Sequence, residues 1–150
     1  MSPDGLFAFF NVAVLPAWAL LAVAPGWIWT RRLVNAVWIP FLLTAVYLYA
    51  LVSAGPPPEG AGFSTLAGVM VLFTSPMAVL AGWVHYLAFD LFVGSWEARD
   101  AQRHGIGRGW MILPLFSTLM AGPVGLSLYL AIRWVKTRSV SLQEEGDGRE

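Results

Sequence analysis

Residues 75–100 read SPMAVLAGWVHYLAFDLFVGSWEARD and decide the fold. Ser75 is a good N-cap and Pro76 suits the first position of a helix, so the stretch predicts a helix that begins at Pro76. The residues that follow are mostly apolar over the ~20 positions that a helix needs to cross a membrane. The stretch therefore predicts a membrane-spanning helix over residues 76–97.

Three further stretches carry no charged residue and are each longer than the ~20 residues of a membrane crossing. Tryptophans crowd near their ends, as is typical of side chains at the lipid headgroups: Trp27, Trp29, Trp110 and Trp134. The spans predicted for these stretches are residues 6–25, 33–53 and 111–134.

The composition agrees with a membrane protein. Hydrophobic residues make up 57% of the 150 residues and charged residues 12%, whereas a soluble domain has about 25% charged residues. A chain of this size cannot bury so much apolar surface in water, so its main partner is the lipid bilayer. The predicted fold class is all-α integral membrane, with four transmembrane helices. The net charge of zero gives no indication of nucleic acid, and the absence of cysteine excludes thiolate chemistry.

The segments between the spans predict one smaller element. Ser64 is the expected N-cap of a short helix over residues 65–73, too short to cross and therefore interfacial or re-entrant. Three consecutive prolines, Pro56 to Pro58, form a stiff linker before it. Residues 1–138 are predicted to form one membrane domain, followed by a polar, disordered tail over residues 139–150.

The basic residues predict the orientation only weakly. With four full crossings, five of them fall on one side and four on the other: Arg31, Arg32, Arg99, Arg103 and Arg108 against Arg133, Lys136, Arg138 and Arg149. The positive-inside rule then mildly favours a location of both termini outside the cytoplasm. The N-terminus has no basic signal region, and the Ala, Gly and Arg usage suggests a bacterial inner membrane.

Asp90 is the most unusual residue, because it lies about 20 Å along the predicted helix, where a carboxyl is costly. A functional role is the default interpretation of a carboxyl at this depth in the membrane. The alternative is a structural hydrogen bond to Tyr86 or to Asn11 of the first span. Helical periodicity places Tyr86, Asp90 and Glu97 on one face and His85 on the opposite one.

The candidate catalytic residues are Asp90, His85 and Glu97, and the candidate substrate contacts are Trp83, Tyr86, Asn11, Gly122 and Pro123. Each has a structural alternative. His85 can bond a backbone carbonyl, and Asn11 can join two helices. Gly122 and Pro123 can form a packing kink in the last span. Glu97, Asp100 and His104 have a spacing that suits a metal, but solvated carboxylates paired with Arg99 and Arg103 are favoured, so no metal is predicted.

The run from Gly82 to Leu91, with Gly94, Glu97, Asp100 and the block from Gly122 to Leu126, resembles a known family. This is the abscisic-acid-deficient or neoxanthin-synthase-like family of membrane proteins. The resemblance extends over roughly residues 6–134, more weakly outside these blocks.

The resemblance implies an isomerase, because plant members of the family are implicated in making neoxanthin from violaxanthin. That conversion turns an epoxide into an allene without net redox change, so no cofactor is expected. We infer Asp90 as the acid and His85 or Glu97 as the base. In a bacterium the ligand would be another carotenoid or hydrophobic isoprenoid. The second hypothesis is a non-catalytic scaffold or accessory protein that binds pigment or a partner, and a homo-oligomer is compatible with either.

Overall fold

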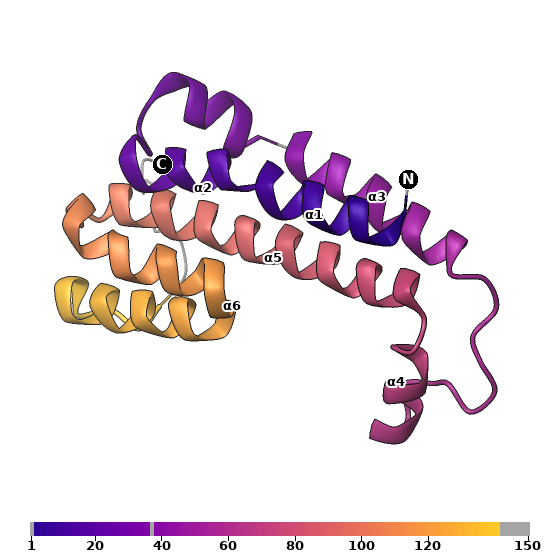
Figure 1. The fold of residues 1–150 in the computed structure, drawn as a ribbon. Helices are drawn as coiled ribbons and strands as arrows, with labels where there is room; N and C mark the ends of the chain where they lie inside the picture. The colour runs from indigo at the N-terminus through magenta and orange to yellow at the C-terminus, as the bar shows by residue number, and fades with distance from the viewer. Residues whose placement is uncertain (1, 37, 142–150) are drawn as a thin grey trace, which may run out of the picture.

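The structure is a computed structural model that describes residues 2–36 and 38–141, and within these ranges it contains helices and no strands (Figure 1). This confirms the all-α fold class. In chain order the elements are α1 (Pro3–Ala13), α2 (Leu15–Val23), the π-helical turn η1 (Thr30–Val34), α3 (Trp38–Ser53), α4 (Leu66–Leu72), α5 (Pro76–Arg103) and α6 (Arg108–Thr137).

Four helical stretches are long and apolar enough to cross a membrane, as the sequence predicted: Pro3–Val23, Thr30–Ser53, Pro76–Arg103 and Arg108–Thr137. Large apolar side chains cover their outward faces, as at Phe41, Phe92 and Phe116. Because water would strongly disfavour such a surface, these stretches identify a multi-pass integral membrane protein.

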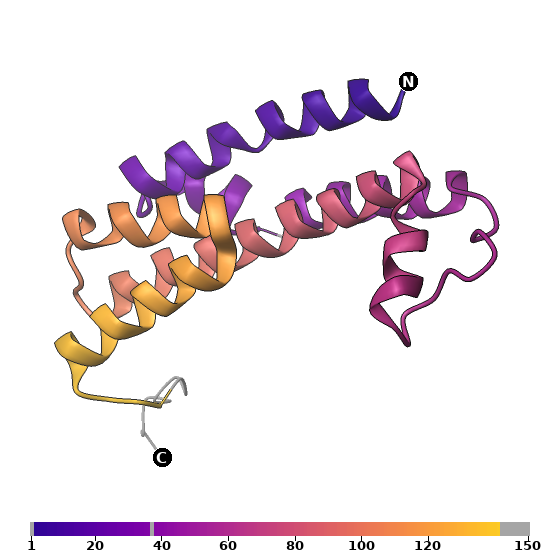
Figure 2. The same cartoon turned by 60° about the horizontal axis from the view of Figure 1, so that its bottom comes forward.

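The central element is α5, which packs against α1, α2, α3 and α6 (Figures 1 and 2). Its start follows the prediction, because the backbone N–H of Ala78 donates to the Ser75 hydroxyl at 3.5 Å. The helix runs past residue 97 and ends at Arg103. Gly105 then adopts a φ of 64°, and the N–H of Ile106 donates to the Ala101 carbonyl at 2.8 Å. This closes the helix with a Schellman motif.

The predicted short helix is present as α4, but its cap differs from the expectation. Thr65, and not Ser64, is the N-cap, because its extended backbone places the hydroxyl 3.1 Å from the Gly68 N–H. The predicted tail lies mostly outside the described residues, which end at Ser141.

The last span, α6, is broken at Ala121, whose φ of −158° and ψ of 72° are not helical. Pro123 follows and cannot donate a backbone hydrogen bond, so the helix is not held straight there. Figures 1 and 2 show that the first arm (residues 108–120) and the second arm (residues 122–137) run in opposite directions. The expected kink is therefore a full reversal.

The ends of the two arms meet, since the Lys136 ammonium lies 4.5 Å from the centroid of the Trp110 ring. The expectation that α6 carries Arg133, Lys136 and Arg138 to the opposite side is therefore wrong. The physical reason is the break at Ala121, which returns the second arm towards the C-terminal end of α5.

This reversal gathers positive charge at one end of the bundle, which we call the basic end. It comprises η1, the end of α5 and the two ends of α6 with the C-cap residue that follows (Figure 1). These segments carry all eight Lys and Arg residues within the described ranges: Arg31, Arg32, Arg99, Arg103, Arg108, Arg133, Lys136 and Arg138. The acidic residues Asp4 and Glu59 lie towards the other end, where α1 begins and α3 has ended. The positive-inside rule therefore predicts that the basic end faces the cytoplasm and that α1 starts on the outer side of the membrane.

Cysteine labelling tests this topology, because the chain has no cysteine of its own. We expect a membrane-impermeant maleimide to label Glu59→Cys in intact cells. Gly107→Cys, between α5 and α6, and Ser139→Cys, after α6, should both be labelled only in opened membranes. Labelling of Gly107→Cys and Ser139→Cys from opposite sides would mean that α6 crosses the bilayer fully.

Candidate functional site

Three carboxylates form a stripe along the face of α5 that α6 covers. Asp90 is 9% exposed, Glu97 0% and Asp100 5%. A buried carboxyl inside a membrane protein is costly unless other groups compensate it. The three differ sharply in the partners that they have, and this difference separates structural from reactive candidates.

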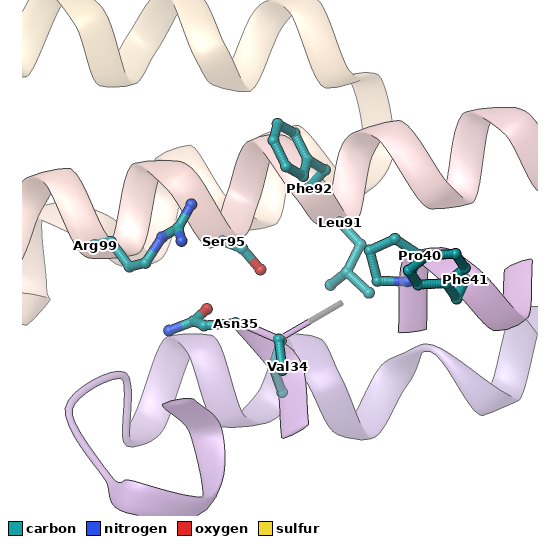
Figure 3. A pocket seen from close by; sticks show the side chains of 9 residues that line it. Val34, Asn35, Pro40, Phe41, Leu91, Phe92, Ser95 and Arg99 are labelled. Carbon is teal, nitrogen blue, oxygen red and sulfur yellow. The ribbon is translucent and has the colours of Figure 1, made fainter. Parts of the chain in front are cut away.

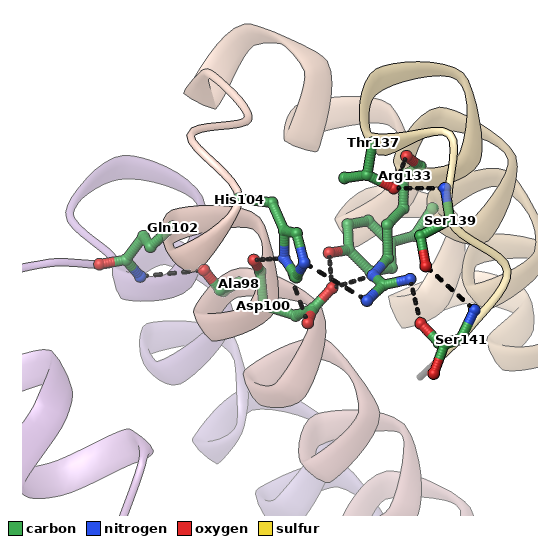
Figure 4. Close-up of polar contacts among 9 residues, drawn as sticks. Ala98, Asp100, Gln102, His104, Arg133, Thr137, Ser139 and Ser141 are labelled. Atoms are coloured by element: carbon green, nitrogen blue, oxygen red, sulfur yellow. Dashed lines mark hydrogen bonds and ion pairs between the residues drawn. The ribbon is translucent and has the colours of Figure 1, made fainter. Parts of the chain in front are cut away.

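Asp100 is held on several sides (Figure 4). The Arg133 Nε donates to Asp100 Oδ2 at 2.7 Å, and the Tyr129 hydroxyl donates to the same oxygen. The His104 Nδ1 lies 3.5 Å from the other carboxylate oxygen. Arg133 also donates to the backbone carbonyl of Ser141 at 2.7 Å. Asp100 therefore fastens the second arm of α6 to α5, and its expected pairing in solvent with Arg99 is wrong.

The spacing that suited a metal does not produce a metal site. Among the described residues, no three His, Cys, Asp or Glu side chains converge as metal ligands would. Asp100 is engaged by Arg133, and the His104 ring lies 2.9 Å from the backbone carbonyl of Asp100 through Nδ1.

Glu97 has one hydroxyl as its partner within the described chain. Thr118 Oγ1 lies 3.0 Å and 3.1 Å from the two carboxylate oxygens, and it has a single proton to donate. Thr118 is itself enclosed between the arms of α6, because a Cβ atom at Gly125 would collide with its hydroxyl and backbone. Gly125 thus allows the arms to approach closely enough to seal Glu97.

Asp90 lies beneath the break in α6 and is the least satisfied carboxyl. Its Oδ2 is buried and has no hydrogen-bond partner among the described residues. A Cβ atom at Gly122 would collide with Asp90 Oδ1, so glycine is required there for the two helices to meet. One turn earlier, the Tyr86 hydroxyl donates to the Leu119 carbonyl at 3.3 Å. We call Tyr86, Asp90 and Gly122 the bend site.

The other predicted contacts surround the bend site without entering it. The Trp83 indole N–H donates to Asn11 Oδ1 at 2.8 Å, so Asn11 joins α1 to α5 and is not the partner of Asp90. The Trp83 and Tyr86 rings lie 5.3 Å apart between centroids. Pro123 follows Gly122 at the break. The structure therefore brings most of the predicted residues to one region.

His85 is separate from the bend site. It stacks on Phe89, with centroids 4.4 Å apart, and lies 6.0 Å from the Tyr47 ring of α3. It lines a cavity of about 460 Å³ between α3, α5 and the α3–α4 connection. Because Asp90 faces α6 and His85 faces α3, the two side chains do not act on the same atoms.

An apolar groove adjoins the bend site. It has a volume of about 260 Å³ and runs between α2 and the first arm of α6, where Trp18, Phe116 and Leu119 line it. Leu119 connects the two features, since its carbonyl accepts a hydrogen bond from the Tyr86 hydroxyl of the bend site.

The arrangement is that of an integral membrane protein with a buried, incompletely paired carboxyl and an apolar groove between α2 and the first arm of α6. The profile of the ABA DEFICIENT 4-like family matches residues 5–129, and the chain belongs to this family. This confirms the resemblance seen in the sequence and supports a carotenoid-related membrane protein. No curated protein and no solved structure matches the chain significantly.

Sequence analysis missed the partners that α6 supplies: Thr118, Tyr129 and Arg133. One pattern indicates two of them. Tyr129 and Arg133 are four residues apart on one helical face near the end of an apolar stretch. An arginine at that depth needs a partner, and Asp100 is one of few carboxylates in the spans.

Breaking the ion pair between Asp100 and Arg133 should destabilise the fold. Arg133→Gln leaves Asp100 buried without its cation, which costs about 3–5 kcal/mol. We expect a correspondingly lower free energy of unfolding in detergent. Adding Asp100→Asn to Arg133→Gln should recover part of the loss. If the losses of the two single variants simply added up in the double variant, this would contradict a direct pairing of Asp100 with Arg133.

The close approach of the arms can be tested with two glycines of α6. Gly125→Ala forces a methyl group against Thr118 and should lower stability by about 1–3 kcal/mol. Gly109→Ala is the matched control, since a Cβ atom there meets nothing within 4 Å. It should be neutral or slightly stabilising. Equal effects on the unfolding midpoint would mean that the arms do not pack as described.

Proposed function

We propose that this protein binds a carotenoid or a related isoprenoid in the membrane and isomerises it by acid–base chemistry at the bend site. The observation that carries the proposal is the buried, unpartnered Oδ2 atom of Asp90. A carboxyl that only held helices together would be expected to use both oxygens, as Asp100 does. Asp90 instead keeps one oxygen available beneath a glycine.

The reaction that fits is the opening of an epoxide to an allene. Protonated Asp90 gives its proton to the epoxide oxygen as the C–O bond breaks, and that oxygen becomes a hydroxyl. The resulting carboxylate then removes a proton from the neighbouring polyene carbon, and the allene forms. Asp90 ends protonated again, so the step needs no oxidant or reductant.

One carboxyl suits this cycle better than a pair. Glu97 lies two helical turns from Asp90, about 10 Å along the axis, which is too far to serve adjacent substrate atoms. His85 lies on the opposite face of α5. Tyr86 is placed to orient the substrate oxygen, since it lies one turn before Asp90 on the same face of α5 and its hydroxyl reaches the Leu119 carbonyl of α6.

The groove between α2 and α6 supports entry of the substrate from the lipid. Its walls are apolar, as at Trp18, Phe116 and Leu119, and suit a polyene chain. The break at Ala121 acts as a hinge in the part of α6 that covers Asp90. Gly122 and Pro123, which follow it, do not hold the two arms in one continuous helix. We place the protein in a bacterial cytoplasmic membrane, with the basic end inside.

Binding without catalysis is the second candidate function. It is favoured by the larger cavity at His85, where Tyr47, Phe63 and Phe73 offer flat surfaces to a pigment. In this case Asp90 would only support the packing of α6.

Pigment profiling separates the two functions. The chain is expressed in a bacterium that makes an epoxidised carotenoid, and the pigments are compared by chromatography. We expect an allenic isomer with the natural chain and at least a hundredfold less with Asp90→Asn, which has the same shape but cannot donate the acidic proton. Asp4→Asn, an exposed change of the same type at the start of α1, is the matched control.

The amount of folded protein in the membrane is measured in parallel. Loss of the isomer at unchanged protein level supports catalysis by Asp90. An unchanged pigment profile with the natural chain, despite co-purified carotenoid, would leave binding as the function. Full activity of Asp90→Asn would refute the proposed role of this carboxyl.

A further inference from the structure

A pocket with polar residues in its lining lies on the side of α5 that faces α3, away from the bend site. It is a pocket of about 300 Å³ near the basic end, and Figure 3 shows its lining. Arg99, Ser95 and Asn35 lie at one end of it, and Leu91, Pro40 and Phe41 lie at the other. The pocket therefore has a polar end and an apolar end.

Two buried polar atoms of this pocket have no partner among the described residues. They are the Nε of Arg99, which can only donate, and the Oδ1 of Asn35, which can only accept. A buried guanidinium N–H without an acceptor is costly, as is a buried amide oxygen without a donor. The hydroxyl of Ser95 at the same end can do either. The site thus needs a ligand with both an acceptor and a donor.

The charge and the depth of the pocket narrow the ligand further. Arginine keeps its charge, so the acceptor that suits it best is an anion. Arg99 comes one helical turn before the end of α5, which places it at the level of the lipid headgroups of the cytoplasmic leaflet. Phe41 and Phe92, which are 69% and 58% exposed, line the pocket on its lipid side.

We propose that this pocket binds the headgroup of an anionic phospholipid that also carries a free hydroxyl group. The phosphate accepts from Arg99, and the headgroup hydroxyl donates to Asn35. The acyl chains lie along Phe41 and Phe92. The site contains no residue of the bend site, so it stands independently of the proposed isomerase.

Lipid titration of the purified full chain in detergent, followed by native mass spectrometry, tests the site. The probes are phosphatidylglycerol, phosphatidylcholine and phosphatidylmethanol with identical acyl chains. We expect phosphatidylglycerol to bind at least about tenfold more tightly than phosphatidylcholine, because only the former presents an uncompensated anion. Phosphatidylmethanol lacks the headgroup hydroxyl and should bind with intermediate affinity.

Two variants assign the contacts. Arg99→Gln should remove the preference for phosphatidylglycerol over phosphatidylcholine. Asn35→Leu should remove only the difference between phosphatidylglycerol and phosphatidylmethanol. Arg31→Gln is the matched control, since Arg31 is an exposed arginine of the same end outside the pocket. The unfolding midpoint of each variant is measured to confirm that it folds.

The outcomes are distinct. Loss of preference in Arg99→Gln alone supports the site. Equal losses in Arg99→Gln and Arg31→Gln would mean that the basic end attracts anions as a whole, and would overturn it. Displacement of phosphatidylglycerol by millimolar inorganic phosphate would also overturn it, because the pocket would then hold free phosphate. Neither of these two negative outcomes bears on pigment isomerisation, so this test is separate from the test of the proposed function.

Discussion

The buried ion pair between Asp100 and Arg133 is the contact on which the rest of the structure depends. Both side chains are buried, so each charge is strongly unfavourable without the other. Pairing them requires the second arm of α6 to lie against the C-terminal half of α5. A straight α6 would carry Arg133 far from Asp100, so the pair and the break at Ala121 imply each other. The basic end, the enclosed Glu97 and the covered Asp90 all follow from this reversal.

The stripe of carboxylates on α5 becomes less satisfied from the basic end towards the break. Asp100 has an arginine, a tyrosine and a histidine beside it, Glu97 has a single threonine, and Asp90 has an oxygen without a partner. The break itself explains this order. Irregular backbone is tolerated at membrane depth only where protein covers it, and Gly122 contributes no side chain that could satisfy Asp90. The same feature that reverses α6 therefore leaves Asp90 with an unpartnered oxygen beneath the break, and this oxygen is the basis of the proposed acid–base chemistry.

Much of this architecture can be predicted from the sequence, because local rules govern it. Ser75 and Pro76 start α5, charge-free stretches mark the spans, and helical periodicity alone separates Asp90 from His85. The course of α6 cannot be predicted in the same way. Gly122 and Pro123 indicate a break, but its angle depends on Arg133 finding Asp100, a contact between distant parts of the chain. The error in placing Arg133 had the same cause. Thr118 was missed because a threonine in an apolar helix is ordinary until a buried carboxylate faces it.

Arg99 and Asp100 show why adjacent opposite charges need not neutralise each other. Consecutive residues of a helix point about 100° apart, so the two side chains meet different neighbours. Asp100 faces α6 and receives Arg133, whereas Arg99 faces α3 and the pocket that contains Asn35. Since Arg133 already compensates Asp100, no acidic side chain among the described residues lines the pocket beside Arg99. An anion from the surrounding lipid is the simplest compensation available at that depth. In this fold α5 thus separates the bend site beneath α6 from the pocket beside α3, in which we propose that a lipid headgroup binds.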